Sequence, residues 1–145
     1  MKNRIIKPWI FYILSFTWGL PVTLSGFLIA FLFLITGHLP KRCGYSFRFE
    51  SSRLKGGFSA GIFIFTKRGA TIHLLCHEHG HGVQNCFYGL LMPFVVSIPS
   101  SSRYHFRNFK KHVLKKPPKT PYESIWFEAE ATKIGTLYKD LIQNS

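Results

Sequence analysis

The feature that most constrains this chain is a long apolar run near its N-terminus. No charged residue occurs from Trp9 to Gly37. A helix of about 20 apolar residues spans a bilayer, so this run is long enough to cross one with some tilt. It is about twice as long as the apolar region of a signal peptide, and no A-x-A cleavage site follows it. We therefore expect residues 1–40 to form a retained N-terminal transmembrane helix that serves as a membrane anchor.

The middle of this run holds Gly19-Leu20-Pro21, which predicts a kink. A hairpin folded there would have halves of about 12 to 16 residues, too short to cross alone, and would leave every basic stretch on one side. For a spanning helix, five Lys/Arg residues from Lys41 to Lys55 outnumber the three before Trp9. The positive-inside bias then predicts an integral protein of the inner or plasma membrane with the bulk of its chain in the cytoplasm.

Composition narrows the remaining possibilities. A chain of 145 residues has room for about one domain. Three Cys residues are too few for a disulfide scaffold and agree with a reducing compartment. The net charge of +13 implies an anionic partner.

After the anchor we expect a small domain, residues 41–145, that is mainly α-helical with one short β-hairpin. Residues 45–50 alternate apolar and polar side chains, and residues 61–66 are rich in β-branched and aromatic types. Because Gly56-Gly57 lies between these runs, they predict a β-hairpin over residues 45–66. The expected order is then a helix over 71–98, a basic loop over 100–119 and a C-terminal helix over 120–142. In that last helix Thr120, Pro121 and Glu123 have the spacing of a capping box.

Two further stretches bear on the membrane. The apolar run Phe87–Ile98 is too short to span and has basic clusters on both sides, so we expect it to dip into the membrane or pack on the first segment. The stretch Arg103–Lys119 holds seven Lys/Arg and no acid, with Tyr104, Phe106 and Phe109 between the charges. In a membrane-tethered chain this composition predicts contact with anionic lipid head groups. Nucleic acid is not expected, since no RNA-binding or helix-turn-helix signature is present.

The motif that carries chemistry is the HExxH sequence from His77 to His81. Two His residues at i and i+4 project from one helix face and can hold a Zn²⁺ ion through neutral imidazole nitrogens. Glu78 is placed to take a proton from a metal-activated water, as a general base. Gln84 follows His81 by three residues and can orient that imidazole or bind substrate.

A catalytic zinc site needs a third protein ligand and one open position. The candidate residues are Glu123, Glu128, Glu130, His73, His79, Cys76 and Asp140. Three successive helical turns cannot easily reach one ion, which disfavours His73. Glu130 lies nearer the middle of the apolar face of its helix, whereas Glu128 lies beside small residues that would let two helices approach closely. Helical periodicity alone leaves the choice between these two Glu residues open.

The HEHGH motif followed by a helical Glu resembles the zinc metallopeptidases called zincins, and among them the gluzincins. The chain also resembles a group of small uncharacterised bacterial membrane proteins that share a G-H-x-x-Q helix (80–84), a G-x-x-x-P run (89–93) and a W-x-E-x-x-A-x-x-x-G helix (126–135). The resemblance covers about residues 73–135. It implies His77 and His81 as zinc ligands and Glu78 as the base, and it favours Glu128 over Glu130 as the third ligand.

The chain departs in two ways from the enzymes that it resembles. It lacks the later Asp-Gly ligand motif of the site-two intramembrane proteases, and it has no room for the N-terminal sheet and second domain of soluble gluzincins. The function expected is a membrane-associated zinc metallopeptidase that hydrolyses peptide or protein substrates. The alternative is a non-catalytic membrane protein with a structural metal site or a partner-binding role.

Overall fold

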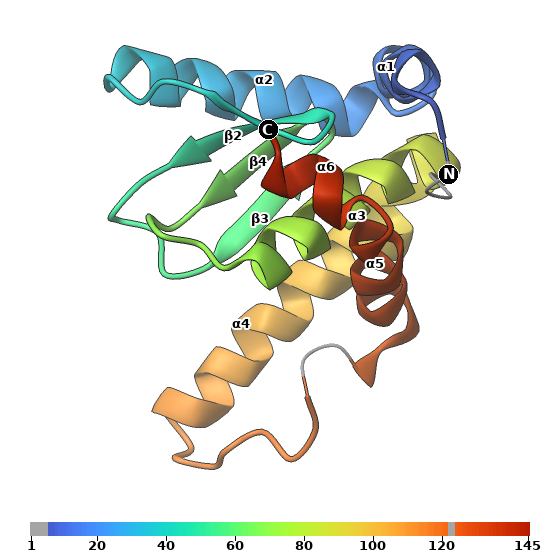
Figure 1. Ribbon diagram of the computed structural model, residues 1–145. Helices are drawn as coiled ribbons and strands as arrows, with labels where there is room; N and C mark the ends of the chain where they lie inside the picture. Colours follow the sequence, from blue (N-terminus) through green and yellow to red (C-terminus); the bar gives the residue numbers. More distant parts are fainter. Residues whose placement is uncertain (1–5, 122–123) are drawn as a thin grey trace.

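The computed structural model describes residues 6–121 and 124–145, which form a mostly helical molecule with one small sheet (Figure 1). The prediction of a mainly α-helical chain is confirmed. The elements in chain order are α1 (Pro8–Phe16), α2 (Leu20–Ile35), β1 (Lys41–Cys43), β2 (Ser46–Glu50), β3 (Gly57–Ala60), β4 (Phe63–Thr66), α3 (Ile72–Tyr88), a 3₁₀ turn η1 (Gly89–Leu91), a π-helical turn η2 (Pro93–Ser97), α4 (Ile98–His112), α5 (Trp126–Thr136) and α6 (Lys139–Gln143).

The N-terminal apolar run forms two helices rather than one. α1 and α2 meet at 90° around Gly19, and no single described helix is long and apolar enough to span a membrane. Two pairs of consecutive helices are long and apolar enough only when each pair is taken together. They are α1 with α2, and residues 72–91 with residues 93–112, which are bent by 116°. The predicted kink is therefore present, and the run is not the single continuous helix that was expected. The side-chain amide of Asn85 holds the bend by donating to the Gly19 carbonyl at 3.1 Å.

Helix α2 lies along one face of the sheet (Figure 1). Its inner side is made of small or short side chains, including Thr23, Gly26 and Ala30, all buried. A Cβ on Gly26 would overlap the backbone oxygen of Ala60 in β3, so the glycine permits a close approach of helix and strand. The outer side of α2 carries exposed Leu, Phe and Ile side chains.

The sheet has the order β1-β2-β4-β3, and its pairing corrects the predicted hairpin. β2 and β4, the two runs expected to form it, are neighbours but run parallel, with Phe47 opposite Phe63. Parallel pairing needs a crossover, and β3 supplies it by pairing antiparallel to β4. The tight turns lie instead at Gly44, with φ of 61°, and at Gly61, with φ of 62°, where a side chain would be strained.

Helix α3 ends ten residues before the predicted boundary at residue 98. Gly89 terminates it with a positive φ of 51°, and a Cβ at this position would overlap the indole of Trp18. The chain bends by 116° across η1 and η2, where Pro93 lacks the amide that a continued helix would need. The expected basic loop over 100–119 is then largely α4, which has no buried residue.

The C-terminal helix also differs from the prediction. α5 begins at Trp126 with Ile125 as its N-cap, so Thr120 does not cap it, and Glu123 lies outside the described residues. The carbonyl of Thr120 instead accepts a hydrogen bond from Arg107 of α4 at 2.7 Å. The predicted packing of the HExxH helix against the Glu-bearing helix is present. A Cβ on Gly80 would overlap the Ala131 carbonyl, and one on Gly135 would overlap the Cys76 carbonyl, so α3 and α5 nearly touch.

Candidate metal centre

Two buried helices present the candidate ligands. α3 begins at Thr71, whose hydroxyl accepts from the Leu74 amide at 3.3 Å and caps the helix. One turn of this helix separates His77 from His81, so both imidazoles point the same way. Glu128 lies in the first turn of α5 and is fully buried.

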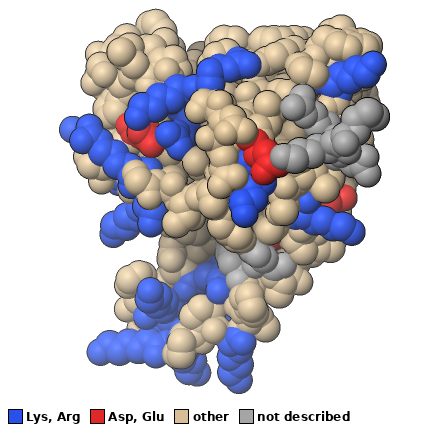
Figure 2. Space-filling view, viewed as in Figure 1, with Lys and Arg blue, Asp and Glu red and all other residues tan. Residues whose placement is uncertain are grey.

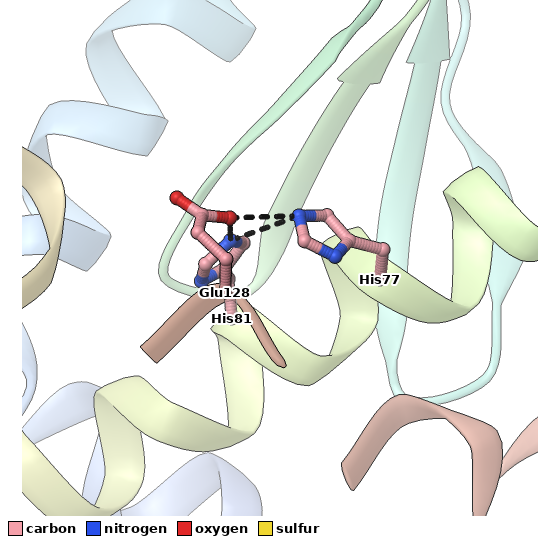
Figure 3. Close-up of side chains that lie close together, drawn as sticks. All are labelled: His77, His81 and Glu128. Atoms are coloured by element: carbon pink, nitrogen blue, oxygen red, sulfur yellow. Dashed lines mark hydrogen bonds and ion pairs between the residues drawn. The ribbon is translucent and has the colours of Figure 1, made fainter. Parts of the chain in front are cut away.

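His77, His81 and Glu128 form a compact group that can hold a metal ion (Figure 3). Their facing atoms make a nearly regular triangle. The two Nε2 atoms are 3.2 Å apart, and Glu128 Oε2 lies 3.1 Å from His77 Nε2 and 3.3 Å from His81 Nε2. Ligands on a tetrahedral Zn²⁺ with bonds of 2.0–2.1 Å are about 3.3 Å from one another. The triangle therefore fits one tetrahedral ion with little movement.

The outward-facing nitrogens of the two imidazoles are held by side chains. His81 Nδ1 lies 2.8 Å from Gln84 Oε1, and His77 Nδ1 lies 2.8 Å from Thr132 Oγ1. An amide oxygen only accepts, so His81 carries its proton on Nδ1 and turns the lone pair of Nε2 inward. A cation at the centre of the triangle satisfies these inward-facing acceptors together.

The electrostatics of the group also fit a cation. Burial raises the pKa of the Glu128 carboxyl, but the adjacent His77 and His81 side chains outweigh burial and hold that pKa below its usual range. Glu128 Oε1 is buried without a hydrogen-bond partner among the described residues. The carboxylate thus remains ionised and keeps an acceptor atom that no protein group satisfies.

Glu78 lies beside the group without belonging to it. Its carboxyl is buried beside Ser59 and would contact a Cβ built on Gly57 at 3.1 Å, so it lies against strand β3. Burial raises the pKa of Glu78, although the nearby His81 and His77 act in the opposite direction.

The group opens into a cleft of about 850 Å³ between β3 and α4. The strand side is formed by residues 54–59, including Gly57, Phe58 and Ser59. The helix side is formed by one face of α4, including Ser100, Tyr104 and Lys111. His77, Glu78, His81 and Glu128 all line the cleft.

The structure separates Glu128 from the other ligand candidates. Glu130 is held away from the triangle, because its Oε2 accepts from Gln84 Nε2 at 2.7 Å and from the Tyr88 hydroxyl at 2.8 Å. Among the described residues no other candidate joins the three ligands. The remaining candidates are His73, exposed on the cleft wall; His79, whose Nε2 accepts from the Tyr45 amide at 3.1 Å; Cys76, buried against Gly135; Asp140, in α6; and Glu123, outside the described residues.

Sequence reasoning missed the supporting roles of Thr132 and Tyr88. Thr132 follows Glu128 by four residues and so shares its helix face, a spacing that could have indicated a partner for a ligand imidazole. Tyr88 carries no comparable signal. Comparisons with protein families, with curated proteins and with solved structures found no match. The assignment of the site therefore rests on its own geometry.

Proposed function

We propose that this chain is a membrane-associated zinc metallopeptidase. The observation that carries the proposal is the ligand triangle of 3.1–3.3 Å at the floor of an open cleft, with a buried carboxyl beside it. Two imidazoles and one carboxylate are a common ligand set of catalytic zinc. Zinc, when bound, supplies Lewis acidity and lowers the pKa of a coordinated water.

Glu78 is the general base in this proposal. It is not one of the three metal ligands, it lines the cleft, and the Ser59 side chain lies beside it. The carboxylate accepts a proton from the attacking water and delivers it to the leaving amine. Edge strand β3 offers backbone groups along the same cleft, so an extended peptide can pair with it and present an amide above the triangle.

The membrane contact is proposed for the outer side of α1 and α2. Five apolar side chains of α2 are each more than half exposed: Leu24, Leu28, Phe31, Leu32 and Ile35. Such a continuous apolar surface is typical of a protein or lipid interface, and the basic flank at Lys41 and Arg42 favours the cytoplasmic leaflet. We expect the protein to stay with membranes after high-salt and carbonate washing, and release by salt alone would contradict this contact.

The alternative, a structural metal site, differs in the number of ligands. Structural zinc is enclosed by four protein ligands, whereas the group in the described residues has three and faces a cleft. The open fourth position favours catalysis.

The test compares two single substitutions in purified full-length protein. Glu78→Gln should retain zinc, measured by elemental analysis, and lose about 10²- to 10⁴-fold in peptide cleavage, because general-base catalysis is removed. If the site is purely structural, Glu78→Gln should not differ from the parent in zinc content or in peptide cleavage. Glu128→Gln should lose both zinc and activity, since a neutral amide is the poorer ligand. Cleavage by Glu78→Gln at the parent rate would refute the proposed mechanism.

A further inference from the structure

The two walls of the cleft come from segments without acidic residues. No Asp or Glu occurs between Glu50 and Glu78 or between Glu78 and Glu123. These segments supply the strand wall, residues 54–59, and all of α4. The carboxylates that line the cleft are Glu78 and Glu128, both at its floor.

Both walls carry cations. Lys55 lies on the strand side, and Arg107 and Lys111 lie on the helix side. Figure 2 shows Lys and Arg side chains crowding the free end of the α4 arm. Among the described residues, no salt bridge involves Lys55 or Lys111. Cleft walls that carry one sign of charge concentrate ligands of the opposite sign.

The spacing along α4 locates these cations relative to the metal group. Ser100 lies beside Glu128 and so marks the floor of the cleft. At about 1.5 Å per residue, Arg107 lies roughly 10 Å and Lys111 roughly 16 Å farther along the helix. An extended peptide advances about 3.3 Å per residue, so these distances correspond to the third and the fifth residue from the scissile bond.

We propose, on the basis of the peptidase function above, that the cleft selects an acidic peptide whose Asp or Glu residues lie about three to five positions from the scissile bond. The geometry of α4 favours a peptide over a lipid surface. Its cleft face is polar and cationic, whereas exposed Phe106, Phe109 and Val113 lie on the opposite face. Figure 1 also shows α2 on one side of the sheet and the far end of α4 on the other, so one flat membrane does not meet both.

Tyr104, one of the aromatic residues between the charges of the basic stretch, lines the cleft. It stands one turn beyond Ser100, between the metal group and the cations.

The experiment measures binding and cleavage of a peptide pair that is identical except for Glu or Gln at the third to fifth positions. Binding is measured by fluorescence anisotropy on zinc-loaded full-length Glu78→Gln protein, and cleavage on the parent. We expect the Glu peptide to bind about tenfold more tightly at low salt, with the advantage shrinking as ionic strength rises. Adding Lys111→Gln should reduce the advantage severalfold. The matched control, Lys116→Gln, removes a charge that does not line the cleft and should leave the advantage intact.

The outcomes separate this inference from the proposed function. Equal binding of the two peptides would overturn the inference, whatever the rate of cleavage. Preferential binding without cleavage by the parent would sustain the acidic-peptide cleft and refute the peptidase. Binding of phosphatidylserine vesicles that depends on Lys111, with no preference between the peptides, would overturn the inference in favour of a lipid surface.

Discussion

The geometry of the metal group depends on the close packing of α3 against α5. The substitution Gly135→Ala tests this dependence. A Cβ at Gly135 would overlap the backbone oxygen of Cys76, which cannot rotate away. The added Cβ and the Cys76 carbonyl oxygen must lie at least about 3.3 Å apart, so the two helices must separate by about 1 Å or more. Overpacking of this kind costs about 1–3 kcal/mol, and the gain of up to about 1 kcal/mol in helix propensity offsets only part of it.

The same separation moves Glu128, on α5, away from His77 and His81, on α3. Oε2 now lies 3.1–3.3 Å from their nitrogens, and a tetrahedral ion does not tolerate a triangle widened to more than about 4 Å. We expect zinc affinity to fall about 10- to 100-fold, as when groups that orient a ligand are lost.

The assay combines thermal unfolding in mild detergent with competition for zinc against a chromophoric chelator. Gly80→Ala should behave like Gly135→Ala, because its Cβ would overlap the Ala131 carbonyl. Two glycines provide controls. Gly82→Ala meets its nearest atom only at 3.0 Å, so it should be mild, and Gly56→Ala meets nothing within 4 Å and should be neutral. If Gly135→Ala matched Gly56→Ala in both stability and zinc affinity, the helix-contact argument would be refuted.

Three further predictions concern individual side chains. Gln84→Ala removes the acceptor that holds the His81 proton on Nδ1, so zinc affinity should fall about 10- to 100-fold while the circular dichroism spectrum persists; unchanged affinity would assign Gln84 to packing alone. Glu130→Gln should keep zinc bound, since Glu130 accepts from Gln84 and not from the metal group, and loss of the metal would move the third ligand to Glu130. Burial lowers the pKa of His79 to about 4, from 6.5. As the pH falls, the unfolded chain therefore binds this proton before the folded chain does. The contribution of neutral His79 to the free energy of unfolding is full above pH 6.5 and decreases towards pH 4, by at most about 3 kcal/mol. Urea unfolding of His79→Gln should lack this acid-dependent loss, and parallel pH profiles for parent and variant would contradict the assignment.

Local sequence patterns predicted the site better than they predicted the path of the chain around it. The i, i+4 spacing placed His77 and His81 on one helix face, as observed. Small residues around Glu128 indicated close helix packing, and Gly135 against Cys76 provides it. Periodicity could not separate Glu128 from Glu130, because the choice depends on Gln84 and Tyr88, which lie on another element and occupy Glu130.

The errors in the fold arose where contacts distant in sequence decide the local structure. Gly89 ends α3 where Trp18 packs against it, and Asn85 holds the bend at Gly19. Neither contact is visible in an apolar pattern. The parallel pairing of β2 with β4 was missed because β3, Gly57–Ala60, is short and shows no clear alternation of apolar and polar residues. Without a strand predicted between them, β2 and β4 were expected to pair directly as an antiparallel hairpin.

The central claim, a zinc ion held by two His residues and one Glu, is tested most directly by zinc X-ray absorption on the purified full-length protein. The account predicts about one zinc per chain, with only nitrogen and oxygen neighbours at about 2.0–2.1 Å. It also predicts that Glu128→Gln lowers zinc occupancy while Glu130→Gln does not. Absence of zinc from protein purified without chelator, or a sulfur neighbour at about 2.3 Å that marks a Cys ligand, would contradict it.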